Sequence, residues 1–136
     1  MNIFAITRKP ALASAMCQAP LSLDCCDALP PSDLLGQMVM IETMGRLLGC
    51  ARFTGIVTLH GESVREFEHR SAEQIRSSAG RMASPFWSRL WVFEDGMTFE
   101  RAVEIDAGKS GAAWRVPDGL RAELETARRI ARYAVV

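Results

Sequence analysis

The clearest hydrophobic pattern in the chain lies between Pro31 and Gly49, in the segment PSDLLGQMVMIETMGRLLG. Placed on a helix at about 100° per residue, its apolar residues form one stripe with apolar flanks on both sides. The stripe consists of Leu34, Met38, Ile41, Gly45 and Leu48, one flank of Leu35 and Val39, and the other flank of Met40, Met44 and Leu47. Ser32 or Asp33 is a suitable N-terminal cap, and Gly49 is suited to ending a helix. The pattern predicts a helix over residues 32–48. It would be apolar nearly all round, and therefore covered by a core or by a partner.

Two more segments have helical patterns. Ser63 and Glu66 form a capping box, which predicts a helix over residues 63–82. The alternative is a strand over 62–68 with a helix that begins at Ser71.

Near the C-terminus the apolar residues share one face of a predicted helix over 118–134, and arginines take the other face with Glu125.

Alternating patterns predict the strands. Residues 2–7 and 52–59 are rich in apolar and β-branched residues, which suit a sheet. Asp95-Gly96 separates two alternating runs and predicts a hairpin with a two-residue turn. A helix over 98–106 is the competing interpretation.

These elements predict a single α+β domain over residues 1–136, with an antiparallel sheet that contains the Asp95-Gly96 hairpin and about three packed helices. The chain is long enough to bury a substantial core. The order of the strands does not follow from the sequence.

The composition and net charge indicate which partners and which compartment the sequence favours. Sixteen basic residues balance sixteen acidic ones, so the net charge favours neither nucleic acid nor an anionic membrane. Fourteen of the basic residues are arginines, which suit bidentate contacts to carboxylates or phosphates. No run reaches the roughly 18 apolar residues that a membrane span needs, and residues 1–16 fit an export signal poorly. With no regular spacing among the four cysteines, we expect reduced thiols and a cytoplasmic protein.

No catalytic or metal-binding pattern is complete. His60 and His69 are the only histidines, and the E-x-x-H spacing of Glu66 and His69 lacks the second copy that a carboxylate-bridged metal site needs. Cys50 follows the end of a predicted helix, where the dipole disfavours a thiolate. Gly108-Lys109-Ser110 lacks the upstream glycine of a phosphate-binding loop. We therefore predict no catalytic residue, no metal and no cofactor.

The candidate partner-binding residues are two aromatic residues of the predicted hairpin and the arginines of the last helix: Trp91, Phe93, Arg121, Arg128, Arg129 and Arg132. Aromatic and arginine side chains are typical anchors of protein interfaces. The competing interpretations are that a helix covers Trp91 and Phe93, and that the arginine face is solvated and paired with Glu125.

The resulting hypothesis is a non-enzymatic protein that binds another protein or a second copy of itself, as a regulator, inhibitor or immunity-type protein. A nucleic-acid-binding module that uses the arginine face is one alternative, and a small enzyme centred on His60 or His69 is the other. On the first hypothesis, truncation of Trp91 weakens binding, whereas truncation of Met44 lowers stability.

Overall fold

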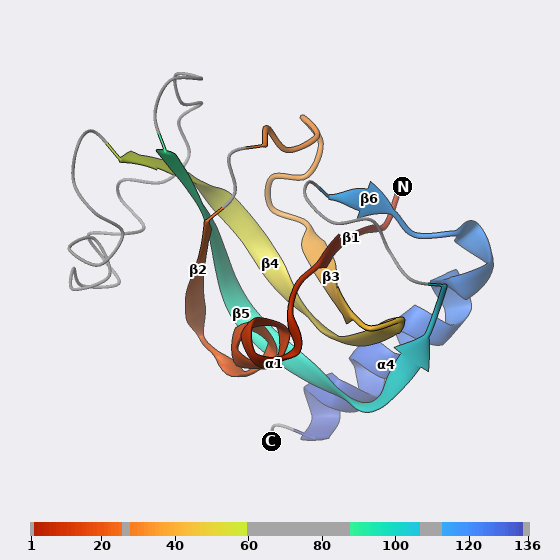
Figure 1. Ribbon diagram of the computed structural model, residues 1–136. Helices are drawn as coiled ribbons and strands as arrows, with labels where there is room; N and C mark the ends of the chain where they lie inside the picture. The colour runs from red at the N-terminus through yellow and green to blue at the C-terminus, as the bar shows by residue number, and fades with distance from the viewer. Residues whose placement is uncertain (1, 26–27, 60–87, 107–112, 135–136) are drawn as a thin grey trace.

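The computed structural model describes residues 2–25, 28–59, 88–106 and 113–134, and these ranges form one mixed sheet with two helices (Figure 1). The elements in chain order are β1 (Phe4–Thr7), α1 (Pro10–Gln18), β2 (Leu21–Cys25), β3 (Met38–Thr43), β4 (Arg46–Leu59), β5 (Ser88–Glu104), β6 (Trp114–Arg115), the 3-10 turn η1 (Asp118–Leu120) and α4 (Arg121–Ala134). The α+β class is confirmed, but the sheet dominates and the described residues form two helices rather than about three. The helix expected over 63–82 lies outside the described residues.

The six strands have the order β2-β5-β4-β3-β1-β6. The prediction of an antiparallel sheet is wrong for one pair, because β1 runs parallel to β3, whereas the other neighbouring strands are antiparallel. In a flat sheet β1 and β2 would lie about 19 Å apart, because each of the four steps between them spans about 4.8 Å. Nevertheless Arg8, directly after β1, bonds to Asp24 of β2. The sheet therefore coils until the edge strand β2 meets the chain directly after β1.

The segment from Pro31 to Gly49 is not the predicted helix over 32–48. It forms β3, a two-residue turn and the start of β4. Side chains of β3 alternate between two cores: Val39 and Ile41 contact one, whereas Met40 contacts the other. The sequence of a strand that is buried on both faces is a continuous run of apolar residues, and this pattern is the same as that of a helix that is apolar all round.

The turn between β3 and β4 is formed by Met44 and Gly45, which have φ angles of 51° and 80°. Two positive φ angles in a two-residue loop are the requirement of a type I′ hairpin turn. The buried Glu42 carboxylate accepts a hydrogen bond from the Gly45 N–H at 2.8 Å and so stabilises the turn. Met44 is 82% exposed, so the prediction that it belongs to the core is wrong.

The predicted hairpin at Asp95-Gly96 is also wrong, because β5 continues through it as one strand of 17 residues. Here Asp95 and Gly96 stand opposite the single residue Ala51 of β4, which makes a β-bulge, and Asp95 takes the positive φ of 56°. A Cβ at Gly96 would collide with carbonyl oxygens at the end of α1, including that of Ala19 at 2.5 Å. The glycine is therefore needed for the close approach of α1 to the sheet.

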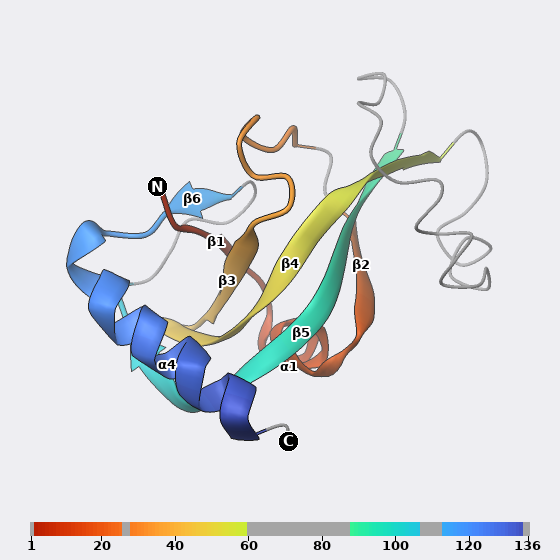
Figure 2. The same cartoon turned by 180° about the vertical axis from the view of Figure 1, so that it is seen from behind.

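The two helices cover opposite faces of the coiled sheet. The core on the α1 side contains Met16 and Cys17 of α1 with Phe53, Trp91 and Phe93 of the sheet. The core on the other side contains Leu124 and Ala131 of α4 with further sheet residues, and Figure 2 shows α4 running across that face. The predicted helix over 118–134 is confirmed as η1 followed by α4.

Candidate functional site

Two of the candidate binding residues, Trp91 and Phe93, lie in the core. Both are 0% exposed, and their rings form a tilted cluster with Phe53, with centroid distances of 5.3 Å and 5.6 Å from the Phe53 ring. Trp91 Nε1 donates a hydrogen bond to the carbonyl oxygen of Ala28 at 3.1 Å. Both faces of the local sheet are covered, so these rings are not on a surface that a partner could contact, and the competing interpretation of a covered pair is correct.

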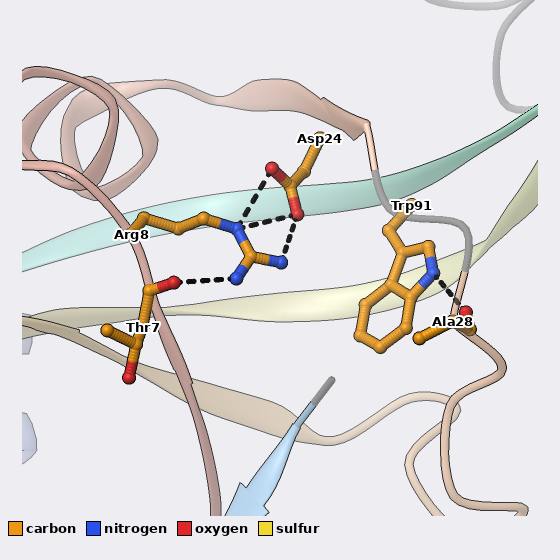
Figure 3. A network of polar contacts seen from close by, with 5 residues as sticks. All are labelled: Thr7, Arg8, Asp24, Ala28 and Trp91. Carbon is orange, nitrogen blue, oxygen red and sulfur yellow. Dashed lines mark hydrogen bonds and ion pairs between the residues drawn. The ribbon is translucent and has the colours of Figure 1, made fainter. Parts of the chain in front are cut away.

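A buried ion pair lies beside this aromatic cluster (Figure 3). Arg8 Nε donates to both carboxylate oxygens of Asp24 at 3.0 Å and 2.9 Å, and its Nη1 donates to the Thr7 carbonyl oxygen at 2.7 Å. The two side chains are 11% and 3% exposed. Asp24 sits opposite Trp91 in the β2–β5 ladder, so its carboxylate points into the coiled sheet.

The Arg8–Asp24 pair has the geometry of a structural contact. Its donors and acceptors largely satisfy each other, and it joins β2 to the chain directly after β1, across the coiled sheet. A ligand at this point would have to break these bonds. The only sequence signal for the pair was one carboxylate in the otherwise apolar strand LSLDC.

The four arginine candidates lie on α4, as the helical spacing predicted; Arg129 and Arg132 are exposed, and Arg121 and Arg128 are half-buried. Arg121, Arg128 and Arg132 fall within an arc of about 40° around the helix axis, and Arg129 is adjacent to them. We call these four residues the arginine row. It extends over about 16 Å of helix, given a rise of about 1.5 Å per residue.

Three of the four arginines in the row have no acidic partner among the described residues. Arg121 Nη2 lies 3.8 Å from Asp118 Oδ1. Within the described ranges Arg128, Arg129 and Arg132 form no ion pair, and neither does Glu125. The intrahelical pairing expected for Glu125 is therefore not formed. This leaves positive charge free to meet an anion.

A pocket of about 380 Å³ adjoins the first half of the arginine row. It lies between α4, the start of β1 and the chain that enters β3, and it is lined by Asn2, Ile3, Gly36, Gln37, Met38, Met40, Arg121, Leu124, Glu125 and Arg128. The Arg128 Nε–H is buried and has no acceptor among the described residues. No sequence pattern pointed to Asn2 or Gln37, because only the packing of β1 and β3 against α4 brings them to the arginines.

Arg128 also affects a cysteine beneath the helix. Burial raises the pKa of the Cys50 thiol to about 11, although the positive charge of Arg128 acts in the opposite direction. Burial and the neighbouring Cys50 raise the pKa of Cys17 to about 12. Both cysteines are free and buried, so the expectation of reduced packing residues is confirmed for these two.

The raised pKa values predict that Cys17 and Cys50 resist alkylation in the folded protein. At pH 8 both thiols are protonated and covered, so iodoacetamide should modify them only after denaturation. Because both folded-state pKa values are raised, their contribution to stability is complete below about pH 9 and is lost as the pH rises toward 11 and 12. Peptide mass spectrometry of native and urea-treated samples checks the first result. Rapid labelling of Cys50 at pH 8 in the native protein would contradict it.

Several other sequence candidates cannot be placed. His60, His69 and Glu66, with the loop at 108–110, lie outside the described residues. Among the residues that are described, no group of three or more histidine, cysteine or acidic side chains has the arrangement of a metal site. Likewise, no helix in those ranges is long and apolar enough for a membrane span.

Comparison with known proteins identifies a shared fold. No protein-family model matches the chain, and no curated protein matches it by sequence. A tyrosine-to-phenylalanine variant of the ASCH protein from Zymomonas mobilis superposes with a TM-score of 0.57 at 12% identity, over 93% of this chain and 98% of that one. The ASCH protein itself gives 0.57 at 13% identity, over 90% and 93%. At this identity the likeness shows the fold alone.

Proposed function

We propose that this protein binds nucleic acid through the arginine row of α4. The observation that carries the proposal is a line of arginines along about 16 Å of one helix flank, of which Arg128, Arg129 and Arg132 form no ion pair with a described residue. A guanidinium binds a phosphate in a bidentate manner. A row of such groups suits an extended polyanion better than a single carboxylate. The balanced net charge does not oppose this, because the charge is local.

Binding of a short oligonucleotide should therefore weaken with salt. Three or four phosphate contacts predict a slope of about −2 to −3 in a plot of log K against log salt concentration. In the double variant Arg128→Ala/Arg132→Ala the magnitude of this negative slope should be smaller by about 1 to 2, since each lost phosphate contact removes about one released counterion. Fluorescence anisotropy across a salt series measures both quantities.

The matched control is Arg46→Ala/Arg101→Ala, which removes the same charge from exposed positions on β4 and β5. It should leave the slope close to that of the wild type. Equal loss of oligonucleotide affinity in both double variants would mean that only the net charge of the protein matters. Absence of oligonucleotide binding to the wild type at low salt would refute the proposed function.

Protein binding is the second candidate function, now without its aromatic anchors. The observation in its favour is a groove of about 710 Å³ on the opposite flank of α4, between the helix and β5. Ile130 lines it and is 43% exposed. The two candidates use opposite flanks of one helix, so substitutions at Arg128 and at Ile130 separate them.

A further inference from the structure

The pocket beside the arginine row is lined by both apolar and polar side chains. Its apolar residues are Ile3, Met38, Met40 and Leu124, and we call them the floor because Met40 and Leu124 are each 1% exposed. The rim consists of two amide side chains, two arginines and one carboxylate: Asn2, Gln37, Arg121, Arg128 and Glu125. Its volume of about 380 Å³ lies within the range of small-ligand sites. Phosphate binding alone does not require an apolar floor.

We propose that this pocket holds one unpaired base of the bound strand; this inference rests on the proposed function. A nucleobase is flat, with apolar faces and polar edges, which matches an apolar floor inside a polar rim. Methionine thioethers make favourable contacts with aromatic rings, and Met38 and Met40 both line the pocket. The site would therefore favour a single strand, because in a duplex the bases are stacked and paired.

Gln37 is placed to contact the edge of such a base. Its Nε2 donates one N–H to the backbone carbonyl oxygen of Asp33, which leaves Oε1 and the second N–H of the amide available. Within the described residues no donor is bonded to Oε1. Oε1 can accept a hydrogen bond from a base N–H, and Asn2 across the rim adds a second amide.

The position of the pocket relative to the arginine row fits a continuous strand. Arg121 and Arg128 line the pocket, whereas Arg129 and Arg132 continue along α4 beyond it. A strand with its phosphates on the last two arginines would therefore reach the pocket with its next nucleotides. Glu125, the one carboxylate at the rim, would oppose a phosphate inside the pocket, which favours a base there.

The test compares a short single-stranded oligonucleotide with a strand of the same length that carries abasic sites throughout. Loss of one stacked base costs on the order of tenfold or more in affinity, so the intact strand should bind at least about tenfold more tightly. The same sequence as a duplex should bind no better than the abasic strand. Parallel RNA and DNA strands show which sugar the site prefers.

Ile3→Trp would fill the pocket, and Ile130→Trp on the opposite flank of α4 is the matched control. The first variant should bind the intact strand as weakly as the abasic one, and the control should keep the difference. If Ile3→Trp fails to fold, 2-aminopurine in the strand gives the second measurement, since its fluorescence should change on binding to the wild-type protein.

The outcomes separate the two proposals. Equal affinity for the intact and abasic strands would overturn the base pocket and leave the proposed function standing. Failure of both strands to bind would remove the proposed function itself. Tighter binding of polyglutamate than of the oligonucleotide would overturn both, in favour of an acidic protein partner.

Discussion

Replacement of Trp91 with alanine is expected to lower the free energy of unfolding by about 3–5 kcal/mol. The ring is fully buried against Phe53 and Phe93, and its indole N–H is bonded to Ala28. Truncation would leave a large cavity and an unpaired carbonyl oxygen in the core. Urea denaturation followed by circular dichroism measures the change.

Two methionines four residues apart provide the matched control. Met40 is 1% exposed, so Met40→Ala should cost about 2–5 kcal/mol. Met44 is 82% exposed in the turn, so Met44→Ala should change stability by no more than about 0.5 kcal/mol. A Trp91→Ala protein as stable as Met44→Ala would contradict the buried position of the ring.

The second large effect is expected at the Arg8–Asp24 ion pair, which joins β2 to the chain directly after β1. Asp24→Ala should cost about 3–5 kcal/mol, because it leaves the guanidinium of Arg8 buried without its carboxylate. The exposed pair Arg52–Asp95 is the control, with side chains 42% and 65% exposed. Asp95→Asn, which keeps a residue that tolerates positive φ, should cost at most about 1 kcal/mol.

A double substitution separates the contribution of the buried charges to stability from that of side-chain packing. Arg8→Met/Asp24→Leu replaces both charges with apolar groups, and such replacements of a buried pair are often neutral or stabilising. It should therefore recover much of the stability that Asp24→Ala loses. If Asp24→Ala alone proves as mild as Asp95→Asn, the pair does not hold the sheet closed.

The C-terminal helix shows what the sequence reveals well. Its apolar and charged residues follow a helical period, and this local pattern predicted both the element and the arginine row. The strand expected over 52–59 was also recovered, as the end of the longer β4. In α4 a covered face and a charged face alternate with the helical period, whereas the β-branched composition of residues 52–59 indicated the strand.

The segment before Gly49 shows where the same reasoning fails. β3 is covered by the α1 core on one face and the α4 core on the other, so no polar residues mark its period. At Asp95-Gly96 the two residues suit a hairpin turn, yet they form a bulge because β4 pairs with β5 both before them, at Glu94, and after them, at Met97. Only the tertiary pairing of the strands decides between these outcomes.

The sequence by itself determined the class of the fold, the last helix and the residues of the arginine row, because each depends on local periodicity or composition. The tertiary structure alone decided that Trp91 is covered, that Arg8 meets Asp24, and that Gln37 and Arg128 line one pocket. These contacts join residues distant in the chain, and their positions follow from the coiling of the sheet, which no short segment encodes.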